Sequence, residues 1–350
     1  MEFSITDTLR QSIEVLSGGK NTVMYDAQGN PNIMVCVPKF DGSVVGLSAG
    51  THPAFIIDED HNEVNEIWVG KYVATRGNNG GCSVWHGLPT FSQTTPDEGR
   101  EMCRKKGKGW HMMSNLEWSA VALSSWVNGH NRPGIYGRHR KVFYKDKDAY
   151  DYFFAPSIRS DDMNFSSDGT PNGIFHMNGL IRQFVDGIYV SKDNRIYYWG
   201  DSENSPINCF DSDHYVDASI EFDKDPGHPF HIDNDHDRGE KLSDYVTKFI
   251  DMRVSGHLDA KMKDAVEKLL LVPTSTMKAS GNPPTGEVSV EDIYSEGRYT
   301  IVRCYDSGCY GSAGTMNGAS DMFTYWVSPF EQERYRNYRD MSFRPVYISK

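Results

Sequence analysis

The sequence has 350 residues, enough for one large domain or two of ordinary size. Hydrophobic residues account for 38% and charged residues for 24%, a composition that excludes a fibrous chain or one disordered throughout. The formal net charge of −12 argues against nucleic acid as a partner, because phosphate groups are bound by clustered Lys and Arg side chains.

Two further features narrow the class of protein. No apolar run approaches the about 20 residues that span a bilayer, and the first residues lack a basic segment followed by an apolar one. We therefore expect neither membrane insertion nor a signal peptide. Six cysteines are too few for a fold built on disulfides, and reduced thiols are the expectation. Four of them are isolated in the sequence: Cys36, Cys82, Cys103 and Cys209.

The amino-terminal part begins with a predicted helix. Apolar residues at helical spacing predict it over residues 4–17, with its end at Gly18 and Gly19. Two runs with strand propensity flank turn residues and predict a hairpin over 22–37. Because residues 1–45 contain too little apolar material to fold alone, we expect a small attachment or oligomerisation module there. The alternative is that they form the first strand pair of the main domain.

The next elements begin with a predicted strand at 66–72. Thr95 with Pro96 marks the start of a helix over 97–106, and Ser114 with Glu117 forms a capping box for a helix over 115–127.

The remaining sequence predicts one more helix, over 258–271, among short strands and turns. The whole pattern predicts an α+β protein with two early helices, a short antiparallel sheet and a loop-rich second half. Strands are expected at 299–304 and 342–348, paired near each other, with the latter close to the strand at 66–72.

Four segments, taken in order, carry a resemblance to a known family. Residues 66–72 read Glu-Ile-Trp-Val-Gly-Lys-Tyr, and residues 103–120 contain Gly-Trp-His-Met-Met-Ser-Asn-Leu-Glu-Trp. Residues 178–187 read Asn-Gly-Leu-Ile-Arg-Gln-Phe-Val-Asp-Gly, and residues 342–345 read Ser-Phe-Arg-Pro. Together they resemble the formylglycine-generating-enzyme/sulfatase-modifying branch of the C-type lectin fold. The resemblance implies a C-type-lectin-like domain over 46–350, with an acidic insertion at about 217–297.

Within that superfamily the sequence is most similar in texture to the variable proteins of diversity-generating retroelements, which are often receptor-binding tail proteins of phages. The resemblance implies a non-enzymatic protein whose variable carboxyl-terminal surface binds a host-cell receptor, either protein or glycan. It also implies synthesis in a bacterial cytoplasm and a final place in a phage tail or virion, outside the cell after assembly. Other tail subunits and further copies of the chain are the additional expected partners, with a trimer by analogy to tail fibres. A purely structural virion protein is the alternative.

The carboxyl-terminal stretches 305–326 and 334–340 are the predicted contact surface. They mix Tyr, Ser, Asn and Asp among glycines, the composition of antibody-like binding loops. We expect these side chains to be exposed on one face of a scaffold fixed by the core residues Trp110, Trp118 and Phe343. The alternative is a glycine-rich set of loops without a partner. The predicted ligand-binding residues are Tyr305, Asp306, Ser307, Tyr310, Thr315, Asn317, Asp321, Tyr325, Trp326, Arg336 and Tyr338.

Two groups of residues raise the question of a metal. Cys304 and Cys309 offer two thiolates for Cu(I), which would fit a copper-dependent oxidase of the formylglycine-generating type. The sequence departs from that catalytic branch at 180–184 and 303–307, and free thiols or a chance disulfide are the other interpretations. The same departures, and the absence of a recognisable catalytic motif, favour a protein that is not an enzyme.

The alternating carboxylates Asp233, Asp235 and Asp237, with Asp244 at the twelfth position, suit Ca²⁺ by their oxygen ligands and spacing. Arg238 stands where an EF-hand loop needs Gly, so a solvated acidic loop is the favoured interpretation. A transition-metal site at His228, His231 and His236 lacks the tight spacing such sites show. Calcium is therefore the one cofactor that the sequence leaves open.

Overall fold

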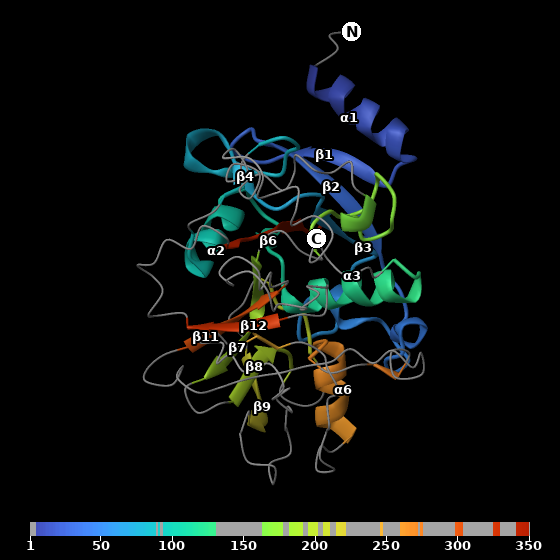
Figure 1. The fold of residues 1–350 in the computed structure, drawn as a ribbon, viewed down its shortest axis with the longest axis vertical. Helices are drawn as coiled ribbons and strands as arrows, with labels where there is room; N and C mark the ends of the chain where they lie inside the picture. The colour runs from blue at the N-terminus through green and yellow to red at the C-terminus, as the bar shows by residue number, and fades with distance from the viewer. Residues whose placement is uncertain are drawn as a thin grey trace, which may run out of the picture.

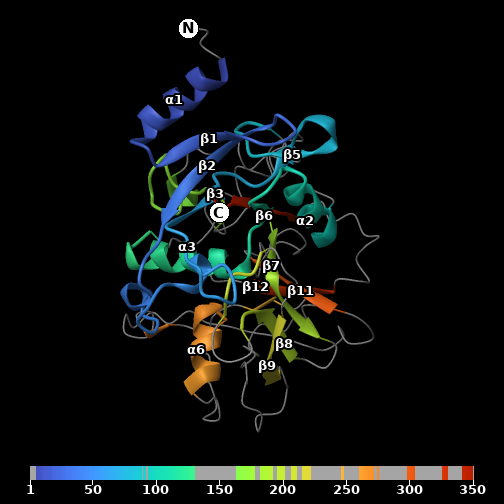
Figure 2. The same cartoon turned by 180° about the vertical axis from the view of Figure 1, so that it is seen from behind.

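The computed structural model places two sheets one above the other, with a helix crossing between them (Figure 1). All strand pairs in them are antiparallel except the short parallel pair of Met341–Ser342 with Arg182–Gln183. Figure 2 shows the same order from behind, with the helix α1 (Ile5–Ser17) above the upper sheet. The structure describes residues 5–88, 90–91, 94–130, 163–177, 182–191, 195–201, 206–210, 215–221, 246–247, 260–271, 274–275, 298–303, 325–329 and 341–349.

The amino-terminal helix and hairpin are confirmed. α1 ends at Gly18 and Gly19, whose φ angles of 61° and 84° a residue with a side chain rarely adopts. β1 (Asn21–Tyr25) and β2 (Pro31–Pro38) pair in antiparallel fashion. β2 also pairs with β3 (Glu66–Gly70), so the hairpin is part of the main sheet, as the alternative interpretation had it. A role of residues 1–45 in attachment or oligomerisation stays a prediction.

The upper sheet joins the two ends of the chain. Its strand order is β1-β2-β3-β14-β6, so the late strand β14 (Pro345–Tyr347) lies between β3 and β6 (Trp110–Met112). Val346 pairs with Val69 on one side and with His111 on the other. The expected closeness of the last strand to the strand at 66–72 is therefore confirmed.

Both predicted early helices are present with the predicted caps. α2 (Pro96–Arg104) begins at Thr95 and α3 (Asn115–Val127) at Ser114, and each cap forms the reciprocal pair of bonds of a capping box. α3 lies between the two sheets in both views (Figures 1 and 2). Trp118, on this helix, is fully buried. Trp110 and Phe343 are buried as well, so the three predicted scaffold residues belong to the core.

The lower sheet is built around β7 (Arg182–Ser191), with β11 (Arg298–Arg303) on one side and β8 (Arg195–Trp199) on the other. β12 (Tyr325–Pro329) and β10 (Val246–Thr247) continue the sheet beyond β11. Its remaining strands are β9 (Tyr215–Glu221), on β8, and β13 (Met341–Ser342), on β7. A separate pair consists of β4 (Thr75–Arg76) and β5 (Cys82–Ser83).

One strand expectation needs correction. The sequence predicted strands at 299–304 and 342–348, paired near each other. The second range is divided between β13 in the lower sheet and β14 in the upper one, because Phe343 and Arg344 carry the chain between them. β11 and β13 do not pair with each other; both pair with β7.

The predicted helix near 258–271 is α6 (Ala260–Lys268), and it is built into the core. The side chains of Leu269, Leu270 and Leu271 are fully buried, and the side chains of Asn115 and Ser119 on α3 donate to carbonyls at its end. The molecule is thus a mixed α and β protein with antiparallel sheets. Whether 217–297 is an insertion stays a prediction. Within the described part of the chain, no helix has the length and apolar character to cross a membrane.

Candidate functional site

The predicted contact surface meets the structure at the ends of its two segments. Tyr325 and Trp326 are the first residues of β12, and they are the predicted ligand-binding residues that the structure describes at the backbone level. The other predicted ligand-binding residues lie outside the described part of the chain: Tyr305, Asp306, Ser307, Tyr310, Thr315, Asn317, Asp321, Arg336 and Tyr338.

Residues 304–324, which contain most of the first segment 305–326, connect two neighbouring strands. Arg303 ends β11 and Tyr325 begins β12, and these two residues are paired in the register of the sheet. β12 is bordered on its other side by β10, where Thr247 pairs with Tyr325. The two ends of the segment are therefore held side by side within a sheet.

Residues 330–340, which contain the second segment 334–340, connect β12 to β13 of the same sheet. They leave the far end of β12 at Pro329 and end at Met341, the first residue of β13. Ser342 on β13 pairs with Gln183 of β7, and Gln183 pairs on its other side with Arg303. Thr247, Tyr325, Arg303, Gln183 and Ser342 thus form one row across five strands, which we call the anchor row.

Within the anchor row, the side chain of Gln183 is fully buried and is hydrogen-bonded at both ends of its amide. Its Nε2 donates to the carbonyl of His176 at 2.6 Å, and its Oε1 accepts from Nε of Arg344 at 3.0 Å. The other guanidinium nitrogens of Arg344 donate to the carbonyls of Gly70 at 2.6 Å and Phe175 at 2.8 Å. Arg344 is fully buried too, so one guanidinium joins β3 of the upper sheet to the anchor row of the lower one.

A second contact fixes β7 to the helices. Arg100 of α2 donates to both carboxylate oxygens of Asp186, each at 2.8 Å, and to Asp97 at 2.8 Å. The amide of Asp186 donates to the carbonyl of Met113 at 2.9 Å, just before α3. Burial alone lowers the pKa of Arg100, but the Asp186 carboxylate outweighs it and the net pKa is raised, so the guanidinium stays charged.

Gly187, the next residue, has a φ of 74° and lies against the indole of Trp199. A Cβ atom there would come within 2.6 Å of the ring, so no larger residue fits without a shift. The Asp-Gly pair that ended the third resemblance segment therefore has a structural role: Asp186 joins β7 to α2, and Gly187 allows the close approach of Trp199.

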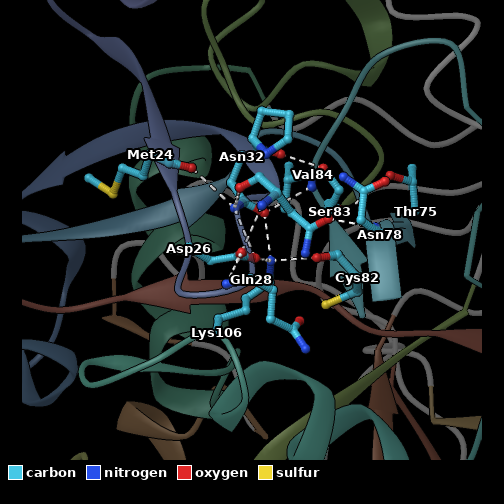
Figure 3. A network of polar contacts seen from close by, with 12 residues as sticks. Met24, Asp26, Gln28, Asn32, Thr75, Asn78, Cys82, Ser83, Val84 and Lys106 are labelled. Atoms are coloured by element: carbon cyan, nitrogen blue, oxygen red, sulfur yellow. Dashed lines mark hydrogen bonds and ion pairs between the residues drawn. The ribbon is translucent and has the colours of Figure 1, made fainter. Parts of the chain in front are cut away.

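Lys106 is the centre of a second buried polar network, in the upper half of the molecule (Figure 3). Its Nζ donates to Oδ2 of Asp26 at 2.7 Å, to Oδ1 of Asn32 at 2.7 Å and to the carbonyl of Cys82 at 2.6 Å. The side chains of Lys106 and Asp26 are both 0% exposed, so no substrate reaches this ion pair. The network joins the end of α2 to the first hairpin and to β5. The sequence predicted Lys106 only as the last residue of the helix over 97–106.

His111 and Glu117 form a pair that resembles an acid–base dyad but is enclosed by the core. Nε2 of His111 lies 2.7 Å from Oε1 of Glu117, whose other oxygen accepts from the amide of Ser114 at 2.7 Å. Asn208 also donates to Glu117, and the ring of Phe210 stacks on His111 at 4.4 Å. Burial lowers the pKa of His111, but the carboxylate outweighs it and the net pKa is raised. Both side chains are buried, so the pair has a structural role. Glu117 caps the start of α3 through Ser114, and its contact with His111 joins α3 to β6.

The metal-ligand candidates from the sequence lie outside the described residues: Cys304, Cys309, His228, His231, Asp233, Asp235, His236, Asp237 and Asp244. Among the residues that the structure describes, no group of three or more His, Cys, Asp or Glu side chains is arranged to hold a metal ion.

No protein-family model matches this chain, and no curated protein is significantly similar to it. The assignment of the candidate site therefore depends on the residues and contacts of this chain alone.

Proposed function

We propose that the protein is a ligand-binding protein with a C-type-lectin-like fold, in which segments 305–326 and 334–340 form the recognition surface. The observation that carries the proposal is the anchor row, which holds three of the four ends of these segments. Arg303 and Tyr325 are paired in the register, and Met341 is adjacent to Ser342 in the same row. Binding loops on a rigid support lose less conformational entropy when a ligand orders them.

Two further features support this assignment. The segments carry Tyr, Asn, Ser and Asp, and tyrosines supply large contact areas at low conformational cost. The buried side chains of Gln183 and Arg344 are hydrogen-bonded through the amide nitrogen of Gln183 and all three guanidinium nitrogens of Arg344. This network favours a rigid support for the recognition surface. The buried ion pairs and the His–Glu pair serve the fold, and we assign the protein no enzymatic activity.

The expected biological setting is host recognition by a phage tail or virion protein, with a protein or glycan receptor on the host cell. This part of the proposal depends on the family resemblance and on the composition of the carboxyl-terminal segments. A reverse-transcriptase gene beside the coding sequence, together with a near-copy of the DNA for residues 300–345, would support diversification. Differences between the copies that are restricted to adenines are the expected result, and differences at all four bases would contradict it.

Binding itself is tested with the labelled full-length chain on an array of immobilised glycans and on intact bacterial cells. We expect the triple variant Tyr305→Ala, Tyr310→Ala, Asn317→Ala to lose at least about 30-fold in affinity, the effect of one contact worth about 2 kcal/mol. The matched control is Glu101→Ala with Lys105→Ala, an exposed pair on α2 whose side chains are each 58% exposed. A triple variant that binds as well as the control would overturn the proposal, and so would a wild-type chain that binds neither probe.

A further inference from the structure

Lys71, directly after β3, is a half-buried lysine whose backbone is fixed on two sides. Its amide donates to the carbonyl of Ile33 at 2.9 Å, and its carbonyl accepts from the amide of Phe175 at 2.8 Å. The side chain therefore starts from a defined position and is still partly exposed to solvent.

The amine of Lys71 lies beside two aromatic rings and one side-chain amide. Its Nζ is 5.9 Å from the ring centre of Phe175 and 6.0 Å from that of Tyr72, and both rings are buried. When the nitrogen of the Asn21 amide donates to two backbone carbonyls, the oxygen of that amide accepts from Nζ of Lys71 at 2.8 Å. One uncharged acceptor and two apolar rings thus hold the amine in place.

Lys71 forms no ion pair within the part of the chain that the structure describes. The carboxylate of Asp168, whose charge acts on Lys71, pairs instead with Lys20, at 3.5 Å from Oδ2 to Nζ. Its Oδ1 accepts from the hydroxyls of Ser166 at 3.0 Å and Thr170 at 2.8 Å. Partial burial without a counter-ion disfavours an ammonium group. Burial accordingly lowers the pKa of Lys71 from 10.5 to about 8, against the effect of Asp168, which raises it.

We propose that Lys71 is a modification site, at which the amine takes up a small acyl group from an acyl phosphate. The uncharged Nζ attacks the carbonyl carbon of the donor, and the bond from this carbon to the phosphate oxygen breaks. The nitrogen gives up one proton, which the leaving phosphate takes up. The products are an amide on Lys71 and inorganic phosphate, and nothing is oxidised or reduced.

The product of this reaction fits the same surroundings. The new amide nitrogen keeps one N–H, which can donate to the oxygen of Asn21 as the amine does now. Because Lys71 is in no ion pair, its acylation breaks none. Two neighbouring lysines differ in these respects: Lys105 is 58% exposed and lies 3.4 Å from a carboxylate oxygen of Glu101, and Lys106 is 0% exposed. This inference does not depend on the proposed ligand-binding function.

The test treats the full-length chain with acetyl phosphate and follows each lysine by mass spectrometry of its peptides. At about pH 7.5, a pKa of about 8 leaves about a quarter of the Lys71 amines uncharged, against roughly one in a thousand for an ordinary lysine. A less basic amine is also a weaker nucleophile, so we expect acetylation of Lys71 to be at least about fivefold faster than that of Lys105. Lys106 should stay unmodified, because its side chain is enclosed.

The pH profile separates reactivity from exposure. The rate at Lys71 should level off above about pH 8, whereas the rate at Lys105 should keep rising to about pH 10. Asn21→Asp gives Lys71 a counter-ion and should raise its pKa, which slows its acetylation toward the rate of Lys105. Lys105→Arg is the matched control and should leave the rate at Lys71 unchanged.

The wild-type rates decide the question even if the Asn21 variant folds poorly. Acetylation of Lys71 that is no faster than that of Lys105 would overturn the proposal. A rate at Lys71 that keeps rising to about pH 10 would overturn it as well, since the amine would then be that of an ordinary exposed lysine.

Discussion

Two buried cations stabilise this molecule in different ways. Lys106 donates to a carboxylate, a side-chain amide and a backbone carbonyl, and it joins the end of α2 to the first hairpin and to β5. Arg344 donates to two carbonyls and the amide of Gln183, and it joins the upper sheet to the lower one. A compact ammonium suits a local network, whereas the planar guanidinium can reach acceptors in three directions. Loss of Lys106 should therefore affect stability alone, and loss of Arg344 should also disturb the anchor row.

The largest expected effect is that of Lys106→Met. The substitution removes the buried partner of Asp26 and leaves that carboxylate uncompensated, which should lower the free energy of unfolding by about 3–5 kcal/mol. Urea unfolding measures it. The matched control is Lys105→Met, one residue earlier, where the side chain is 58% exposed and the expected change is within about 0.5 kcal/mol. Equal effects of the two variants would mean that the network does not stabilise the fold.

A smaller effect is expected for Arg344→Lys, which keeps the charge but cannot reach all three acceptors. Acceptors left unsatisfied in the core should lower the free energy of unfolding by roughly 2–3 kcal/mol. The comparison predicts a second consequence: binding per folded molecule should fall for Arg344→Lys and stay unchanged for Lys106→Met. If both variants bind normally once folded, the hydrogen bond from Arg344 to the anchor row does not contribute to ligand binding.

Two of the buried histidines, His52 and His111, should give the unfolding free energy opposite dependences on pH. Burial, and then the nearby Lys268, lower the pKa of His52 from 6.5 to about 3, so the native protein keeps it neutral while the unfolded chain protonates it. The unfolded state therefore binds more protons between these values, and stability falls as pH decreases from 6.5 toward 3. His111 has the opposite sign: its raised pKa contributes stability below pH 6.5 that is lost as pH rises through the native value.

The measurement for His52 is urea unfolding at several pH values for the wild type and His52→Asn. Asn can still accept the hydrogen bond from the amide of Ala54 that His52 now accepts at 3.2 Å. We expect the wild type to lose stability more steeply than the variant, by up to about 1.4 kcal/mol per pH unit. Parallel curves for the two proteins between pH 6.5 and 3 would contradict the assignment.

The smallest effect belongs to the helix caps. Thr95→Ala removes the side chain that accepts from the amide of Glu98 at 3.2 Å, and it should lower the free energy of unfolding by about 1 kcal/mol. Thr95→Ser keeps the hydroxyl and serves as the control, with a change of a few tenths of a kcal/mol expected. Calorimetric unfolding resolves the two. A loss in the serine variant as large as in the alanine variant would assign the effect to the methyl group.

The elements predicted correctly are those set by nearby residues. Thr95 with Glu98 and Ser114 with Glu117 lie three positions apart, so the sequence alone determines both capping boxes and the starts of α2 and α3. The first helix, the first hairpin and α6 follow from periodicity and turn residues in the same way.

The parts that could not be predicted depend on contacts between distant positions. Lys106 contacts Asp26 and Asn32, 80 and 74 positions earlier, and Arg344 contacts Gly70, 274 positions earlier. No local pattern distinguishes these residues from the other lysines and arginines of the chain. The register that pairs Arg303 with Tyr325 could not be predicted either, because it joins residues 22 positions apart with no turn signal that fixes the pairing.

We propose that recognition and stability depend on different residues of this chain. The most direct test compares the double variant Tyr325→Ala, Trp326→Ala with Trp118→Ala, a truncation of a fully buried side chain. Thermal unfolding and binding per folded molecule are measured for both. We predict that Trp118→Ala loses roughly 3–5 kcal/mol of stability, while the double variant loses binding and barely changes its melting temperature. A double variant that unfolds as readily as Trp118→Ala, but whose folded fraction binds normally, would contradict the account.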